Sequence, residues 1–273
     1  MGIMYHLDLM LITTDPILAK SAELSGVDRI FIDLEVQGKE KRQAGKGLFL
    51  STHRLEDVAK LAQIVTPSRL MVRLNPLYPN SKEEIDDVLK SSIGTMMLPM
   101  FTRASEVETF VRLVDQRCRV SLLLENHEAI ANLDAIVKVK GVDEIHIGLN
   151  DLALSLGFKN WFDIFPTSIL DDLSSKIRKA GLRFGFGGIT VPEKELSIPA
   201  EMVIGEQVRL ASTSTLLGRS FKKSLGSDFS FHQIQTQVQK LRKMIEDWSL
   251  VSVEVRSENY RQLVKTIDLY YNS

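Results

Sequence analysis

The chain has 273 residues, with 34 Lys and Arg against 35 Asp and Glu, so its charge gives no indication of a nucleic-acid or anionic-membrane partner. Its single cysteine, Cys118, excludes an internal disulfide, is interpreted as a core residue and favours a reducing, cytoplasmic location. The amino-terminal segment lacks the basic leader of a signal peptide, and no apolar stretch approaches the ~20 residues of a transmembrane helix.

Eight short apolar runs follow one another along the chain. Each is nearly continuous in apolar character, as expected for strands of a parallel sheet that is covered on both faces. The runs are DLMLITT (8–14), RIFIDLE (29–35), RLMVRLN (69–75), TMMLPMF (95–101), RVSLLLE (119–125), EIHIGLN (144–150), RFGFGGI (183–189) and STSTLLG (212–218).

The segments between these runs carry helix signals. Residues 16–26 start on a proline and end on a glycine, and residues 81–92 open on a Ser cap followed by acids. Apolar residues recur at helical spacing in 104–116 and 127–141. Strands that alternate with helices in this way predict a (β/α)₈ TIM barrel. The rival, an open doubly wound sheet, lacks a glycine-rich phosphate fingerprint, because GFGG (185–188) lies inside a predicted strand.

Two loops are long. Residues 36–53 are basic, and long loops after strands usually belong to the active-site face of this fold. Their lysines, Lys39, Lys41 and Lys46, are interpreted as solvated, with a substrate phosphate or carboxylate as the alternative partner. Residues 152–170 contain the aromatic cluster NWFDIFP, which we interpret as a lid or an interface.

We expect residues 1–223 to form the catalytic barrel and residues 224–273 to form a helical extension. Two apolar stripes at helical spacing define the extension, and they are expected to pack on the barrel, with an oligomer contact as the alternative. The stripes comprise Phe231, Ile234, Val238, Leu241, Ile245 and Trp248, and then Tyr260, Leu263, Ile267 and Tyr270.

Charged residues stand at or just past the ends of several predicted strands: Asp33, Glu35, Arg73, Glu125 and Asp151. In a parallel barrel these ends share one mouth, where neighbouring acids would repel one another and be costly to desolvate. A divalent cation relieves both costs, and Mg²⁺ or Mn²⁺ prefers such hard oxygen ligands. The alternatives are that each acid caps a helix or pairs with a lysine, and that Arg73 forms a structural ion pair with Asp33 or Glu35.

The stretch LLLENHEAIANLDAIVKVKGVDEIHIGLNDLALSLG (122–157) resembles the signature region of the HpcH/HpaI aldolase and citrate lyase beta-subunit family. The segments FIDLE, MVRLNP and MMLPMFTRASEVETFV precede it in the order expected for that family. The resemblance covers roughly residues 5 to 220. It implies a TIM barrel of the phosphoenolpyruvate/pyruvate type and a metal-dependent carbon–carbon lyase.

The resemblance implies that Glu125 and Asp151 are the protein ligands of Mg²⁺, Mn²⁺ or a similar ion. It also places Arg73 beside the keto oxygen of a pyruvate-like unit, where a guanidinium would stabilise an enolate. Backbone N–H groups of residues 148–150 (Gly148, Leu149 and Asn150), which lead into a helix expected at Asp151, are candidates to hold the substrate carboxylate.

Asp33 and Glu35 are two residues apart on one strand and therefore share a face. We expect Glu35 at the mouth and Asp33 one layer deeper, where it would orient Arg73 or a metal-bound water.

One position departs from the family pattern. Pyruvate aldolases of this family carry a His shortly after the second strand, and the citrate lyase branch reads DLED there, but here Val36 follows DLE. A retro-aldol step must remove the proton of the substrate hydroxyl. Candidates are a metal-bound water, Glu35, a lysine of GKEK (38–41) or His53, although His53 is interpreted first as an exposed residue near a helix cap. His127 is interpreted as a helix start and His146 as a core residue.

Three functional hypotheses remain open. The first is a class II aldolase that cleaves a small 2-keto acid aldol, with a keto acid or hydroxy acid as its ligand. The second is a lyase that acts on a CoA thioester of the citryl- or malyl-CoA kind. The third is a non-catalytic metal- and ligand-binding barrel that acts in sensing or assembly. A homo-oligomer is expected in each case.

Overall fold

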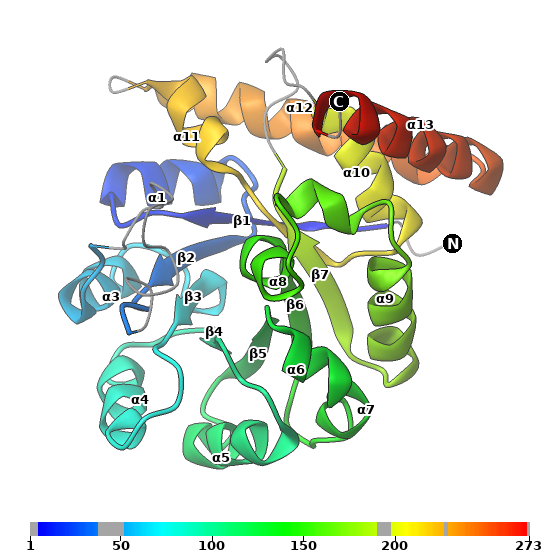
Figure 1. The fold of residues 1–273 in the computed structure, drawn as a ribbon. Coiled ribbons are helices and arrows are strands. Elements are labelled where there is room, and N and C mark those ends of the chain that lie inside the picture. Colours follow the sequence, from blue (N-terminus) through cyan, green and yellow to red (C-terminus); the bar gives the residue numbers. More distant parts are fainter. Residues whose placement is uncertain (1–4, 38–51, 190–197, 227–228, 272–273) are drawn as a thin grey trace.

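The structure, a computed structural model, describes residues 5–37, 52–189, 198–226 and 229–271. Its strands follow chain order around a closed parallel barrel (Figure 1), which confirms the predicted TIM barrel and places all eight predicted strands. The strands are β1 Asp8–Ile12, β2 Arg29–Asp33, β3 Leu70–Arg73, β4 Thr95–Leu98, β5 Arg119–Leu124, β6 Glu144–Gly148, β7 Arg183–Gly187 and β8 Ser214–Leu216.

Helices surround the barrel and form the predicted carboxyl-terminal extension (Figure 1). None of the described helices combines the length and apolar character needed to cross a membrane. The α-helices are α1 Pro16–Leu24, α3 Leu55–Ala62, α4 Ser81–Leu89, α5 Ala104–Val114, α6 His127–Ala131, α7 Leu133–Ile136, α8 Leu149–Ser155, α9 Ile169–Lys179, α10 Ala200–Arg209, α11 Arg219–Leu225, α12 Phe231–Leu250 and α13 Val253–Tyr271, and the 3₁₀ turns are η1 Pro67–Arg69 and η2 Trp161–Ile164.

Local hydrogen bonds correct three sequence expectations about helix ends. Ser81 does not cap α4; Asn80 is the N-cap residue, and the Ser81 hydroxyl accepts from the Tyr78 N–H at 2.8 Å. The expected helix over 127–141 is divided at Asn132, whose side-chain amide donates to backbone carbonyls on two sides. Helix α8 begins at Leu149, two residues before the expected Asp151, because the chain turns directly out of β6.

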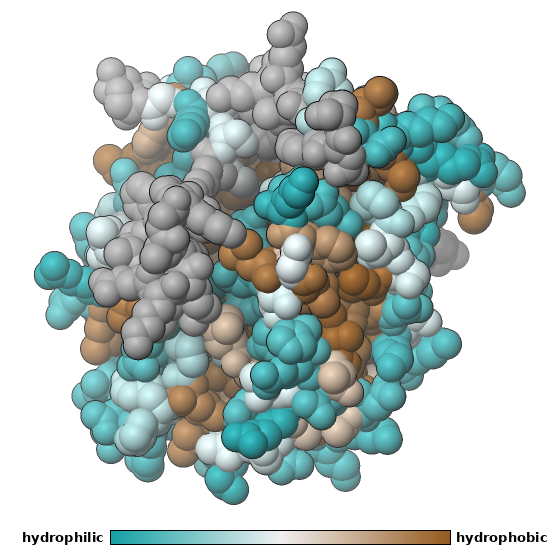
Figure 2. Space-filling view, in the orientation of Figure 1, coloured by the Kyte–Doolittle hydropathy of each residue, from teal (hydrophilic) through white to brown (hydrophobic). Residues whose placement is uncertain are grey.

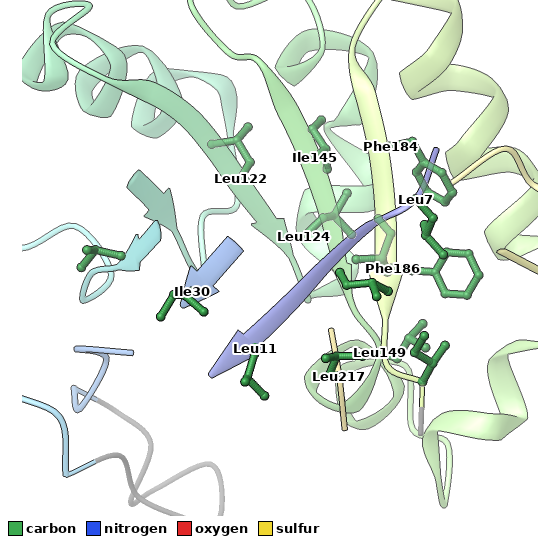
Figure 3. Close-up of a cluster of buried hydrophobic side chains, with 14 of the residues drawn as sticks. Leu7, Leu11, Ile30, Leu122, Leu124, Ile145, Leu149, Phe184, Phe186 and Leu217 are labelled. Carbon is green, nitrogen blue, oxygen red and sulfur yellow. The ribbon is translucent and has the colours of Figure 1, made fainter. Parts of the chain in front are cut away.

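The period of two along each strand separates two apolar layers. One set of side chains points outward and packs beneath the helices, as Leu11, Ile30 and Ile145 do in Figure 3. The alternate set fills the inside of the barrel and consists of Met10, Phe31, Met71, Met97 and Leu123. Burial on both faces explains why the runs read as continuously apolar in the sequence.

Charged side chains close the amino-terminal end of the barrel. Arg29 is 3% exposed and donates at 2.8 Å both to Glu144 Oε2 and to Asp8 Oδ2. Arg183 donates to the same Asp8 oxygen at 2.7 Å. Because these four residues begin their strands, the network lies at the end opposite the mouth and is structural.

The extension packs on the chain's own barrel: α12 lies along α1 and α10, and α13 lies along α10 (Figure 1). Six stripe residues are buried there: Ile234, Val238, Leu241, Ile245, Leu263 and Ile267. Two stripe residues near helix ends, Phe231 and Tyr270, are instead exposed. Arg242 of α12 donates to the backbone carbonyls of Leu7 and Gly26, each at 2.7 Å, and pairs with Asp28.

The aromatic cluster in residues 152–170 is anchored in the core. The rings of Trp161 and Phe162 stack with centroids 3.8 Å apart, and buried Phe165 meets Phe186 of β7 edge-on at 6.2 Å. Figure 2 shows apolar surface gathered next to α8 and α9 on this side of the molecule. The cluster therefore braces α8 against the barrel wall.

Candidate active site

The charged side chains singled out in the sequence stand at the carboxyl ends of neighbouring strands. Asp33 and Arg73 end β2 and β3 and are direct partners in the strand register. Each lies two residues beyond a side chain of the inner apolar layer, Phe31 and Met71, so both point into the barrel mouth. Glu125 follows Leu123 in the same way at the end of β5.

Arg73 is held by two carboxylates. Its Nε and Nη2 donate to the two oxygens of Asp33, both at 2.8 Å, in the planar bidentate arrangement that favours Arg over Lys. Its Nη1 lies 3.3 Å from Glu35 Oε2. Burial alone would lower the pKa of Arg73, but the carboxylates of Asp33, Glu35 and Glu125 outweigh it and raise the pKa above its ordinary value. The guanidinium is therefore a permanent, oriented cation.

The contact between Arg73 and Asp33 is the ion pair expected as the structural alternative for Arg73. The pair lies at the mouth rather than in the barrel interior, and the Arg73 side chain remains 14% exposed. As expected from their spacing, Asp33 and Glu35 both face inward, and Asp33 is the residue that orients the guanidinium.

Glu125 is 2% exposed, and its Oε1 accepts from the backbone N–H of Met100 at 3.1 Å. Gly148, at the end of the adjacent strand, leaves room for this carboxylate. A Cβ at position 148 would lie 2.9 Å from Glu125 Cβ and 3.0 Å from Oε2. The absence of a side chain at position 148 is therefore a steric requirement of the Glu125 carboxylate.

Asp151 lies in the first turn of α8, three residues after Gly148, and is half-buried. The N-cap position of α8 is occupied by Gly148, and no side chain caps the helix. Within the described residues, the Asp151 carboxylate has no hydrogen-bond or ion-pair partner, so capping and lysine pairing do not account for it. Glu125 lies against Gly148 at the start of this junction and Asp151 lies three residues beyond Gly148, and both carboxylates carry hard oxygens of the kind that Mg²⁺ and Mn²⁺ prefer.

The backbone groups expected to hold a carboxylate belong to this same junction. Gly148 precedes α8, and Leu149 and Asn150 are its first two residues. The N–H groups of a first helical turn lack partners within the helix. The Leu149 side chain is buried in the outer core (Figure 3), so only its backbone is available to the mouth.

The histidines occupy different environments. His53 is half-buried rather than exposed, and its Nδ1 accepts from the Asp33 backbone N–H at 3.0 Å. His127 begins α6 as expected and contacts Ser155. His146 is a core residue, as interpreted from the sequence: its Nδ1 lies 3.2 Å from Ser214 Oγ, and burial lowers its pKa to about 4. Burial likewise raises the pKa of the Cys118 thiol to about 11.

A cleft of about 400 Å³ borders the mouth between the chain after β2, the start of α3 and α4. Val36, at the position of the family histidine, is 50% exposed and lines it with His53 and Glu84. Lys39, Lys41 and Lys46 lie outside the described residues. Sequence reasoning missed Asn75 and Glu84, which hold the chain at Val36; the only signal was an Asn two residues after Arg73.

A second group of metal-ligating side chains lies at the opposite end of the barrel. His6, Asp8 and Asp28 bring ligand atoms within 4.8 Å of one another. The aspartates are already paired with arginines, Asp8 with Arg29 and Arg183 and Asp28 with Arg242. This group therefore belongs to the structural network that closes the barrel.

The comparisons with known proteins agree with this architecture. The family model described as HpcH/HpaI aldolase/citrate lyase matches residues 8–186. A 2-keto-3-deoxy-L-rhamnonate aldolase of Salmonella gallinarum is 25% identical over 212 residues, covering 66% of this chain and 74% of the relative.

Two solved structures share the fold. The HpcH/HpaI aldolase from Desulfitobacterium hafniense has a TM-score of 0.59 at 15% identity and covers 89% of this chain and 93% of its own. Protein CitE from Mycobacterium tuberculosis, in complex with magnesium and pyruvate, has a TM-score of 0.57 at 14% identity and covers 95% of this chain and 100% of its own. The family match over most of the barrel shows that the chain belongs to the HpcH/HpaI aldolase/citrate lyase family, a family of metal-dependent aldolases and lyases.

Proposed function

We propose that this protein is a divalent-metal-dependent carbon–carbon lyase that cleaves a small 2-keto acid aldol at the barrel mouth. The observation that carries the proposal is the presence at one barrel mouth of an oriented guanidinium, Arg73, and the buried Glu125 carboxylate beside Gly148. Family membership supports the reaction class.

Glu125 and Asp151 would hold the Mg²⁺ or Mn²⁺ ion, which when bound supplies Lewis-acid stabilisation of the charge that develops on the keto oxygen. Arg73 adds a second fixed positive group at that oxygen, and Asp33 holds the plane of the Arg73 guanidinium in place. Backbone N–H groups of Gly148, Leu149 and Asn150 would bind the substrate carboxylate.

Glu35 is the residue that we propose to take the proton of the substrate hydroxyl. Its carboxylate lies 3.3 Å from Arg73 Nη1, so it reaches the space in front of the guanidinium. Val36 replaces the family histidine and cannot transfer a proton, and Glu35, which directly precedes Val36, is the ionisable residue next to that position.

Proton exchange at the pyruvate methyl group tests this proposal directly. In D₂O with Mg²⁺ or Mn²⁺, the wild-type protein should replace methyl protons with deuterons, as followed by NMR, and chelation of the metal should stop the exchange. Glu125→Gln and Asp151→Asn should each lose this activity, while their metal-free melting temperature stays unchanged or rises, because a buried charge is removed at Glu125 and a half-buried charge at Asp151.

Full activity in either of these variants would refute the metal-site assignment. No exchange by the wild type would favour the non-catalytic hypothesis. Cleavage of a citryl- or malyl-type CoA thioester in a parallel assay would favour the second lyase hypothesis over the first.

We also propose a cytoplasmic location and a homo-oligomeric state. The first is supported by the single cysteine, which leaves this sequence without an internal disulfide. The second is supported by exposed apolar side chains on the extension, among them Leu250 at 79% and Leu269 at 70%. Light scattering on the purified protein decides the oligomeric state, and a monomer at micromolar concentration would refute it.

A further inference from the structure

The chain immediately after β2 is fixed by one side chain. Asn75, which follows β3 and is 9% exposed, accepts two consecutive backbone N–H groups on its Oδ1. The donors are Val36 at 2.9 Å and Gln37 at 3.0 Å. A single amide oxygen thus replaces the strand ladder, which ends two residues before Val36 with the bond from Leu34 N–H to the Arg73 carbonyl at 2.9 Å.

A second side chain determines which way the Asn75 amide faces. Its Nδ2 donates to Glu84 Oε1 of α4 at 2.7 Å, and the backbone N–H of Asn75 lies 3.3 Å from the same oxygen. With Oδ1 committed to two donors, Nδ2 must find an acceptor, and Glu84 provides it. The other oxygen, Glu84 Oε2, is buried without a hydrogen-bond partner among the described residues.

This arrangement acts on the mouth through Glu35. Glu35 is 1% exposed and directly precedes the two residues that Asn75 holds. Its own backbone N–H donates to Asp33 Oδ1 at 3.2 Å, and its carboxylate faces Arg73 Nη1. A shift of the chain at residues 36–37 therefore moves the Glu35 carboxylate relative to the guanidinium.

We propose that Asn75, oriented by Glu84, is a positioning residue that fixes Glu35 and the chain at position 36 against Arg73. The proposal rests on the lyase function proposed above, because Glu35 is the group whose placement it explains. The proposal requires a fixed direction of hydrogen bonding: an acceptor at position 75 must face the N–H groups of residues 36 and 37, and a donor–acceptor pair must join positions 75 and 84.

A reversal of that direction gives the test. In Asn75→Asp the donor to Glu84 is lost and two carboxylates face each other, so the turn should be released. In the double variant Asn75→Asp/Glu84→Gln, one oxygen of the carboxylate at position 75 accepts the two backbone N–H groups, and the other accepts from the side-chain amide at position 84. Charge and shape are thereby conserved while the direction of the side-chain bond is reversed, and the backbone N–H of residue 75 loses the acceptor that it has at 3.3 Å in the wild type.

Two readouts are needed. In pyruvate methyl exchange, Asn75→Asp should lower kcat by about 100-fold, the loss expected from a misplacement of about 1 Å, with a smaller change in KM. The double variant should recover part of that loss, as expected for two side chains that are directly coupled, while the backbone N–H of residue 75 still lacks its acceptor. Hydrogen exchange of the Val36 and Gln37 amides, which requires no activity, should rise in the single variant and return in the double variant.

Asn259→Asp is the matched control. Asn259 is also 9% exposed, and its Nδ2 donates to the Met202 carbonyl at 2.9 Å, where α13 packs on the outer helix α10. It should lower the melting temperature without changing kcat.

Wild-type kcat and amide protection in Asn75→Asp, or no recovery in the double variant, would overturn the positioning role. If the wild type itself shows no methyl exchange, the lyase proposal fails, and amide exchange still decides whether Asn75 and Glu84 hold the turn.

Discussion

The contact between Gly148 and Glu125 gives a quantitative prediction for Gly148→Ala. Gly148 has φ −83° and ψ 85°, so alanine meets no left-handed backbone strain there. Its Cβ would instead lie 2.9 Å from Glu125 Cβ, whereas unstrained carbon atoms approach to about 3.5–4.0 Å. The Glu125 side chain must therefore move by about 0.6–1.1 Å.

A displacement of this size should weaken the metal site far more than the fold. We expect Mn²⁺ affinity, measured by titration calorimetry, to fall by about 10–100-fold, the usual effect of changing a group that positions a metal ligand. We expect kcat for pyruvate methyl exchange to fall by about 100-fold. The free energy of unfolding should fall by about 1–3 kcal/mol, the usual cost of overpacking.

Gly157→Ala is the control on the same segment of chain. Gly157 has φ +79°, and no atom lies within 4 Å of the position that a Cβ would take, so alanine costs about 1 kcal/mol of backbone strain without touching the mouth. It should leave Mn²⁺ affinity unchanged. Equal metal affinity in Gly148→Ala and the wild type would refute the reasoning, because it would show that the Glu125 carboxylate does not need the space at position 148.

Three further perturbations address other parts of the molecule. Arg73→Lys should lower kcat/KM by about 100-fold or more, because an ammonium cannot reproduce the bidentate contact with Asp33. The surface variant Arg117→Lys should remain active. Full activity in Arg73→Lys would show that Arg73 has only a structural role. Burial lowers the pKa of His146 from 6.5 to about 4; the charges of Arg29 and Arg73 lower it further, and the Glu144 carboxylate opposes the shift. The unfolded chain therefore binds the proton first as the pH falls. The contribution of neutral His146 to folding stability is complete above pH 6.5, and about 3 kcal/mol of it is lost as the pH drops to about 4. Urea unfolding at several pH values should show a shallower fall for His146→Gln, and identical profiles would contradict the burial effect. Arg242→Met should cost about 2–3 kcal/mol in thermal or urea unfolding, because two carbonyls lose their Arg242 donor and Asp28 loses its arginine partner. Lys243→Met, in an exposed pair, should cost nearly nothing, and equal effects would show that Arg242 does not tether the extension.

The amino-acid sequence by itself determined the barrel, the order of its strands and the end at which Asp33, Arg73 and Glu125 stand. The physical reason is that these features follow from local periodicity: a strand alternates its side chains every two residues, and parallel strands in a closed barrel bring all their carboxyl ends together. Helix boundaries were less accurate, as at Ser81 and Leu149, because side-chain hydrogen bonds and turns decide them.

Only the tertiary structure decided how the mouth is built. Three contacts at the mouth join segments that no local pattern connects. They are the space that Gly148 leaves for Glu125, the bond from Asn75 to Glu84 and the contact of His53 with Asp33. The register of neighbouring strands and the packing of α4 and α8 against those strands determine which residues meet. Such contacts depend on distances of a few tenths of an ångström between residues distant in the chain, which composition and periodicity do not encode.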